Sequence, residues 1–405
     1  MNFLSFLKDK HNVNDTLVFS IDDKSKVKIG VPAVSRYVHS KKYFEINNGP
    51  TTPDHDFPIG EKMLITPSGN KLETDWLIKL GYLELELQTE SYQDKQDRTT
   101  YPKPRHGQLH IFNRAFHFMS TTAFTHARDI YKIIQEKEQK PAILALLSDN
   151  GNDFSPNNYY VFIALGRLWK CLNLDQLILA SFAPYHSRYN PIEIAWGTMN
   201  IALAQTILCK DTNVKVDTQA AKVNVFRKAM TQLDTIWGKT SYAQKLVKSS
   251  SVDPLVSIED NFSDYEHIKD VLENLGNSAF YDKYKSEIKF LFRHCYRRNH
   301  FLHFRRCYRL NCTHCNNTQK HPEAFDILDG VDDSFGTLLK PILIKQVYEG
   351  KHYPNFIDYQ KSLALRDKIQ EELKQDSEKE EKCHFCYWHF QSDNDKKRHL
   401  AFCAG

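Results

Sequence analysis

The chain has 405 residues, of which 41% are hydrophobic and 26% are charged, and its formal net charge is +4. This is the composition of an ordinary globular protein with room for two or three domains, and the charge is too small to indicate a nucleic-acid partner by itself. No apolar stretch approaches the ~20 residues of a membrane span, and the first residues, MNFLSFLKDKHNVND, lack the basic start and cleavage site of a signal peptide. We therefore expect an intracellular protein with no membrane partner.

The first 120 residues predict strands around an insertion. TLVFSID (16–22) is β-branched and aromatic, and VKIGV (27–31) can return beside it, so residues 16–31 predict a β-hairpin. Residues 36–106 are rich in Pro, Gly, Asn and Thr and predict an insertion with one helical patch, ETDWLIKLGYLELEL. QLHIFNRAFHFMS (108–120) predicts a third strand.

Helices and buried strands alternate from there to about residue 210. PAILALLS and LDQLILASF are short apolar runs typical of buried parallel strands, and segments with helical spacing precede and follow each of them. Such alternation requires a parallel sheet covered by helices on both faces. An opening meander followed by β-α units predicts an α/β fold of the ribonuclease H-like type, with a mixed sheet flanked by helices, over residues 1–210.

Three acids follow predicted elements of this sheet. Asp22 ends the first strand, Asp149 follows PAILALLS, and Glu193 lies in the first turn of the helix after LDQLILASF. The carboxyl ends of parallel strands meet at one edge, so these acids can converge there and hold Mg²⁺ or Mn²⁺. Two such ions ~4 Å apart would activate a water or hydroxyl for attack on a phosphodiester. Singly, each acid is also an ordinary turn or helix-start residue.

VFSIDDKSKVKIG, LLSDNGNDFSPN and APYHSRYNPIEIAW together resemble motifs of the Asp-Asp-Glu (DDE) transposase and integrase superfamily. The likeness covers roughly residues 15–210 and is closest to mobile-element-derived proteins with a Cys-rich C-terminal region. It implies that Asp22, Asp149 and Glu193 are the catalytic metal ligands and that Asp23 and Asp153 support them. PDHDFP (53–58) also matches, without a chemical role for its side chains.

The resemblance implies a transposase-like enzyme that cleaves or joins DNA strands, acts as a homo-oligomer on DNA and is nuclear in a eukaryote or cytoplasmic otherwise. Because the first strand begins by residue 16, no helix-turn-helix fits ahead of it. We expect a fragment, a domesticated descendant, or recognition of DNA ends by the C-terminal half. The alternatives are a catalytically idle DNA- or chromatin-binding protein and a structure-specific nuclease on the same fold.

Seven of the nine cysteines lie beyond residue 290, which favours metal sites in a reducing compartment. The last group predicts a C2HC-type zinc finger with ligands Cys383, Cys386, His399 and Cys403; a charged linker and this finger together make up residues 366–405. The other group predicts a structural zinc knuckle within residues 294–321, in a helical region that spans 211–365. Its ligands are Cys307, Cys312 and Cys315, with Cys295 preferred as the fourth over His294, and with His300, His303 and His314 as substitutes.

Basic and aromatic residues interleave between Lys283 and Arg309, where Glu287 is the single acid. This pattern suits a nucleic-acid backbone, and the predicted contacts are Arg297, Arg298, Arg305 and Arg306. The alternative is a solvated helix face with buried aromatic side chains.

Overall fold

A computed structural model describes the following parts of the 405-residue chain: 15–28, 76–86, 91–93, 100–102, 105–115, 118–119, 121–182, 190–203, 206, 208, 219–253, 255–256, 259–298, 301–307, 312, 314–315, 342–343, 351–352, 383, 388, 390 and 392–403. The PDHDFP segment, Cys386 and the predicted charged linker lie outside these ranges.

A mixed sheet of eight strands forms the centre of the protein, in the order β10-β5-β2-β1-β6-β7-β12-β11. The inner strands β5, β2 and β1 run antiparallel to one another, and β1, β6 and β7 run parallel. The strands of this sheet are β1 (Thr16–Lys28), β2 (Trp76–Glu86), β5 (Arg105–Ala115), β6 (Ile143–Ser148), β7 (Gln176–Ser181), β10 (Lys248–Ser251), β11 (Cys295–Arg298) and β12 (Phe301–Arg305). Short two-stranded pairs are β3 (Ser91–Gln93) with β4 (Thr100–Pro102), β8 (Ser241–Tyr242) with β9 (Lys245–Leu246), and β13 (Ile342–Leu343) with β14 (Lys351–His352).

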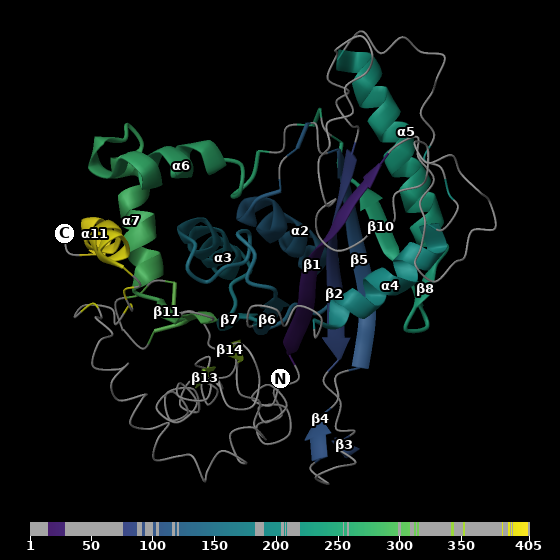
Figure 1. The fold of residues 1–405 in the computed structure, drawn as a ribbon. Coiled ribbons are helices and arrows are strands. Elements are labelled where there is room, and N and C mark those ends of the chain that lie inside the picture. The colour runs from purple at the N-terminus through teal and green to yellow at the C-terminus, as the bar shows by residue number, and fades with distance from the viewer. Residues whose placement is uncertain are drawn as a thin grey trace.

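Helices cover both faces of this sheet (Figure 1). The helices are α2 (Ala123–Gln135), α3 (Tyr159–Cys171), α4 (Pro191–Leu203), α5 (Gln219–Gly238), α6 (Tyr265–Asn274), α7 (Tyr281–Phe292) and α11 (Asp393–Cys403), with a 3-10 turn at Leu275–Asn277. The expected α/β architecture, a large mixed sheet flanked by helices, is confirmed.

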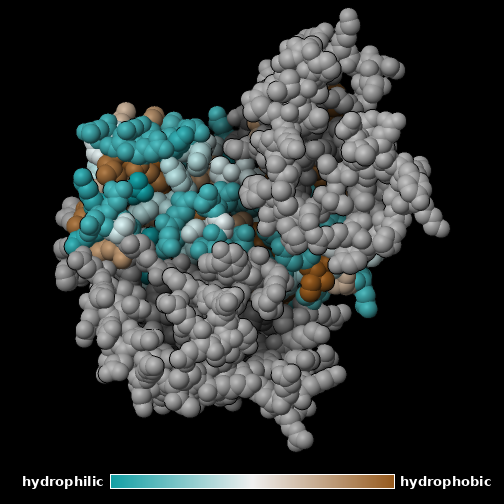
Figure 2. Space-filling view, viewed as in Figure 1, coloured by the Kyte–Doolittle hydropathy of each residue, from teal (hydrophilic) through white to brown (hydrophobic). Residues whose placement is uncertain are grey.

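Two hydrophobic cores lie on opposite faces of the sheet, because strand side chains alternate between the faces. On β6, Leu144 and Leu146 join the core beneath α2, α3, α6 and α7, whereas Ile143 and Ala145 join the core beneath α4 and α5. The first core also contains residues from the C-terminal segment, among them Trp388 and Phe402. Outward-facing residues over α6 and α7 are mostly hydrophilic (Figure 2), as expected for helices that bury one side.

The first two strands, β1 and β2, differ from the sequence prediction. Thr16–Lys28 is one long strand with an irregularity between Lys24 and Val27, so the predicted hairpin over 16–31 is wrong in its described part. Its antiparallel partner is β2, which occupies the patch expected to be helical. β2 contributes Leu80 to one core and Leu83 to the other. A strand buried on both faces has no polar/apolar alternation, which explains the misreading.

The segment between Lys283 and Arg309, in which basic and aromatic residues interleave, is also not one helix. α7 ends at Phe292, and the chain continues as the antiparallel pair β11–β12, which extends the main sheet beyond β7. No helix in the described part of the chain combines the length and hydrophobicity needed to cross a membrane.

Candidate functional site

Asp22 and Asp149 occupy neighbouring positions where the parallel pairing of β1 with β6 ends. Asp22 does not end its own strand as predicted, because β1 continues along β2 to Lys28. The last register pair between the parallel strands β1 and β6 is Ile21 with Ser148, and the two acids are the next residues on each strand. Both side chains are half-buried. Asp149 accepts a hydrogen bond of 3.2 Å from the backbone N–H of Gly151, which starts the turn toward α3.

Hydrogen bonds fasten the start of α4 to the middle of β1, next to Asp22. The Asn190 side chain donates to the carbonyl of Ile21 at 2.9 Å and accepts from the Ser20 hydroxyl. Ser20 in turn accepts from the backbone N–H of Ile192 at 3.0 Å. Asn190 and Ser20 are buried, so the attachment is shielded from water and lies immediately before Asp22. Glu193, in the first turn of α4, is thereby held near this part of β1.

A glycine lets α4 approach this closely. Gly81 on β2 pairs with Asp22 across the sheet, and a Cβ at Gly81 would lie 2.3 Å from the Trp196 ring and 2.9 Å from Ile192. Ile192 lies one position before Glu193 on α4, and Trp196 lies three positions after it. The contact therefore seats the first turns of α4 directly beside Asp22.

We call Asp22, Asp149 and Glu193 the carboxylate edge. Their oxygens do not all lie within 4.8 Å of one another, as those of a one-ion group would. A pair of ions ~4 Å apart needs a wider set of ligands than a single ion, and three half-buried acids near the point where the pairing of β1 with β6 ends fit that need.

A different acid group is drawn together on the opposite face of β1. Asp23 faces α2, because successive strand residues point to opposite faces, and its Oδ1 lies 3.4 Å from Nε2 of His126. Asp153, from the turn after β6, completes a group whose ligand atoms all lie within 4.8 Å of one another. We call these three residues the α2 cluster. Burial raises the pKa of Asp153, His126 opposes the rise, and Asp23 and Asp149 add to it.

A buried chain of hydrogen bonds orients His126. Its Nδ1 lies 2.9 Å from the Tyr82 hydroxyl, which donates to Asp129 at 3.0 Å, and Asp129 accepts from Arg114 at 2.5 Å. Burial, reinforced by Asp129, raises the pKa of Tyr82, so the phenol keeps its proton. All four side chains are less than 4% exposed.

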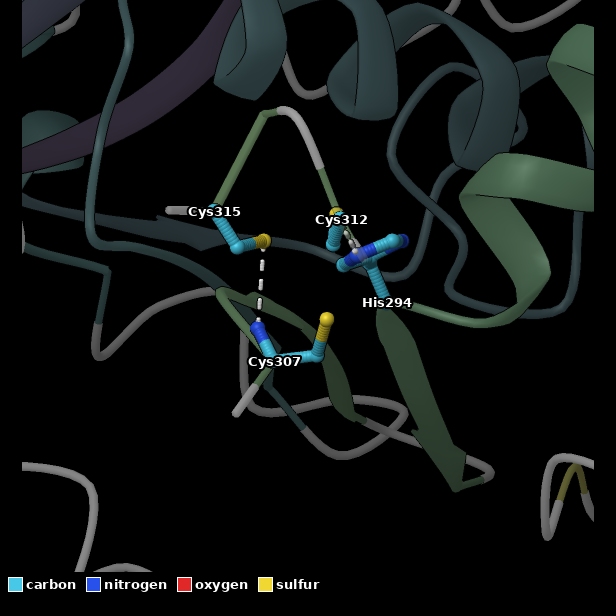
Figure 3. A group of neighbouring side chains, drawn as sticks. All are labelled: His294, Cys307, Cys312 and Cys315. Carbon is cyan, nitrogen blue, oxygen red and sulfur yellow. Dashed lines mark hydrogen bonds between the residues drawn. The ribbon is translucent and has the colours of Figure 1, made fainter. Parts of the chain in front are cut away.

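The second candidate centre is the group His294, Cys307, Cys312 and Cys315, the His294 cluster, whose ligand atoms converge (Figure 3). Cys312 Sγ lies 3.4 Å from His294 Nε2, and Cys315 Sγ accepts from the backbone N–H of Cys307 at 3.2 Å. Nδ1 of His294 donates to the carbonyl of Phe290 at 2.8 Å, which turns Nε2 toward the thiols. These four ligands could hold a metal such as zinc.

The pKa values of two thiols move in opposite directions. Burial raises the pKa of Cys315, whereas hydrogen bonds from the Cys315 backbone and neighbouring thiols outweigh burial and lower the pKa of Cys312.

The preferred fourth ligand of this group is corrected from Cys295 to His294. Cys295 is the first residue of β11; its side chain lies in the hydrophobic core and its thiol is 3.7 Å from the Tyr296 carbonyl. His294 lies in the turn between α7 and β11, and its ring faces the cysteines, whereas the side chain of Cys295 packs in the core. His303 lies 3.1 Å from the Gln176 side chain and His314 packs on Trp169, so neither belongs to the group.

Cys383, His399 and Cys403, the His399 cluster, form the third centre and are all buried. His399 and Cys403 lie one turn apart on α11, and the sulfurs of Cys383 and Cys403 are 4.0 Å apart. Thiolates ~2.3 Å from one tetrahedral ion lie about 3.8 Å apart, so the pair fits zinc. The fourth predicted ligand, Cys386, lies outside the described residues.

Two of the four predicted nucleic-acid contacts are structural. Arg297 and Arg306 are each 1% exposed; Arg297 pairs with Asp395 of α11 and lies 3.8 Å from the Trp388 ring, and Arg306 pairs with Asp175 at 2.9 Å. Their burial removes them from the predicted contacts. Arg305 is half-buried, and the side chain of Arg298 lies outside the described residues.

No protein-family model, curated protein sequence or solved structure matches the chain. The functional assignment therefore depends on the sequence motifs and on the geometry of these groups.

His126 was missed in the sequence, although a signal for it exists. In α2 it shares a face with Asp129, Ile130 and Ile133, at spacings of three, four and seven residues, so two polar side chains interrupt an otherwise apolar stripe. Asn190 was part of the third motif, but its attachment to β1 could not be read from spacing alone.

Proposed function

We propose that the protein is a metal-dependent enzyme of the DDE type, which transfers phosphodiester bonds of DNA. The observation that carries this proposal is the attachment of Asn190 to β1. It holds Glu193 near the point where the parallel pairing of β1 with β6 ends and where Asp22 and Asp149 occupy neighbouring positions. Buried hydrogen bonds of this kind keep acids together that would otherwise repel one another.

The strand order gives a second line of support. Three antiparallel strands followed by two parallel ones, in the order β5-β2-β1-β6-β7, is the arrangement expected of a ribonuclease H-like sheet. In that arrangement the acids at the ends of the first and fourth strands and on the helix after the fifth strand share an active site. Counted in chain order as β1, β2, β5, β6 and β7, the first strand contains Asp22, the fourth is followed by Asp149, and the helix after the fifth carries Glu193. Asp22 lies within β1 and not at its end, since β1 continues to Lys28.

In this proposal the carboxylate edge holds two Mg²⁺ or Mn²⁺ ions, which supply an activated water or hydroxyl and offset charge on the leaving oxygen. The chain's own part is to position the three acids and to keep α4 on β1. The His294 and His399 clusters are structural zinc sites in this account, because neither requires an open coordination position. DNA, a homo-oligomeric assembly on it and nuclear location in a eukaryote remain part of the proposal.

The test is nicking of supercoiled plasmid DNA in Mn²⁺, since it needs no knowledge of a target sequence. Asp149→Asn and Glu193→Gln should each lower the nicking rate at least 100-fold. Glu138→Gln, an exposed acid in the loop after α2, is the matched control and should leave the rate unchanged. Equal nicking by wild type, Asp149→Asn and Glu193→Gln would refute the proposal, and DNA binding without any nicking would favour the idle DNA-binding alternative.

A further inference from the structure

The geometry points to a divalent transition-metal site at Asp23, His126 and Asp153, on the α2 face of β1. This site is separate from the carboxylate edge, because it uses three other side chains on the opposite face of the strand. It therefore goes beyond the proposed DNA chemistry and does not depend on it.

His126 presents a lone pair to the two acids. The Tyr82 hydroxyl donates its proton to Asp129, so its oxygen accepts from Nδ1–H of His126. With Nδ1 engaged by Tyr82, the ring nitrogen that can bind a metal is Nε2, the atom that faces Asp23. A histidine whose other nitrogen is held by a hydrogen bond is the usual arrangement for a metal ligand.

Two buried atoms in this group lack ordinary partners. Nε2 of His126 and Oδ1 of Asp23 form no hydrogen bond with any described residue, although they lie 3.4 Å apart and His126 is 0% exposed. Buried polar atoms are normally satisfied, so this pair needs an explanation. Ligands ~2.1 Å from one ion lie about 3.4 Å apart in tetrahedral and about 3.0 Å apart in octahedral geometry. An ion between the two atoms would satisfy both.

The donor set selects the class of metal. Two carboxylates carry two negative charges, while the Arg114–Asp129 pair behind His126 is internally balanced. A divalent cation therefore neutralises the cluster. Imidazole nitrogen is a poor ligand for Mg²⁺ and Ca²⁺ and a good one for Zn²⁺ and Fe²⁺, and carboxylates add Mn²⁺ to the range. The site should thus prefer a transition ion over Mg²⁺.

Mn²⁺ is the probe, because it can be observed by electron paramagnetic resonance and does not displace zinc from thiolates. The zinc-loaded full chain is titrated with Mn²⁺, and coupling of the bound ion to a histidine nitrogen is measured by pulsed methods. Wild type should show this coupling. The double variant Asp22→Asn/Glu193→Gln, which disables the carboxylate edge, should retain it, so failure of the proposed function leaves this result unaffected.

His126→Gln should lose the nitrogen coupling, and His267→Gln should keep it. His267 is the matched control, since it is a part-buried histidine on α6 that contacts Tyr284 and Phe280 but no candidate centre. If His126→Gln fails to fold, Asp153→Asn tests the same site at a partly exposed position, where Mn²⁺ should bind at least 10-fold more weakly. Absence of coupling in wild type, its persistence in His126→Gln, or unchanged binding by Asp153→Asn would overturn the inference.

Discussion

Gly81→Ala tests the seating of α4 beside Asp22. The new Cβ would lie 2.3 Å from Cζ2 of Trp196, whereas carbon atoms pack at about 3.5 Å or more, so the ring must move by about 1.2 Å. Trp196 is 1% exposed and packs in the core beneath α4 and α5, so we expect α4 to shift with it. Overpacking of this kind costs about 1–3 kcal/mol, and we expect the upper end because Ile192 is also contacted, at 2.9 Å.

Urea unfolding followed by tryptophan fluorescence measures this cost. Gly197→Ala is the matched control, because it lies next to Trp196 on α4 and its Cβ would meet nothing within 4 Å. Alanine there should raise the free energy of unfolding by about 0.5–1 kcal/mol through helix propensity. Gly81→Ala should also weaken Mn²⁺ binding at the carboxylate edge, since metal sites tolerate only ~0.2 Å of ligand displacement. A free energy of unfolding equal to that of wild type would refute the packing argument.

Three further outcomes are expected. Cys307→Ala should remove one equivalent of zinc measured by mass spectrometry of the purified protein, whereas Cys295→Ala should retain it; the reverse pattern would contradict the correction to His294. Burial lowers the pKa of His303 to about 3, so the unfolded chain binds a proton that the folded chain does not between pH 6.5 and 3, and stability falls as the pH falls through that window. His303→Gln should therefore lose about 2 kcal/mol less than wild type between pH 7 and pH 5 in urea unfolding, and equal losses would exclude this role for His303. Tyr82→Phe should weaken Mn²⁺ binding at the α2 cluster ~10–100-fold by releasing His126, and unchanged affinity in the titration would show that Tyr82 does not position it.

The alternation of helices and strands after residue 120 could be read from the sequence. β6 and β7 are short apolar runs bounded by turn residues, and the intervening helices have regular apolar spacing. A local pattern predicts an element well when the same kind of surroundings, such as burial on both faces of a strand, applies along its whole length.

Long-range pairing could not be read in this way. β2 carries Lys79 and Glu84 among apolar residues; Lys79 is buried with its amine 5.7 Å from the Trp237 ring, and Glu84 is bound by His110 and Lys137. Partners from other elements satisfy these charges, so the segment has no strand-like pattern of its own.

The candidate centres show the same difference: features that depend on local spacing could be predicted, and those that depend on long-range pairing could not. Cysteine spacing identified Cys307, Cys312 and Cys315 correctly as one group, because a knuckle is a local structure. The choice between His294 and Cys295 depends on which side of the chain faces the knuckle, and this is set by the pairing of β11 with β12. Likewise, the α2 cluster joins residues from β1, α2 and the loop after β6, which no local motif connects.

The most direct test of the central claim is the number of Mn²⁺ ions bound by the zinc-loaded protein with duplex DNA present, measured by equilibrium dialysis for wild type and Asp22→Asn. A two-metal site at the carboxylate edge predicts that wild type binds two more ions than the variant. Any ion at the α2 cluster is common to both proteins and cancels in the difference. Equal binding by the two proteins would contradict the proposal that Asp22, Asp149 and Glu193 hold the catalytic metals.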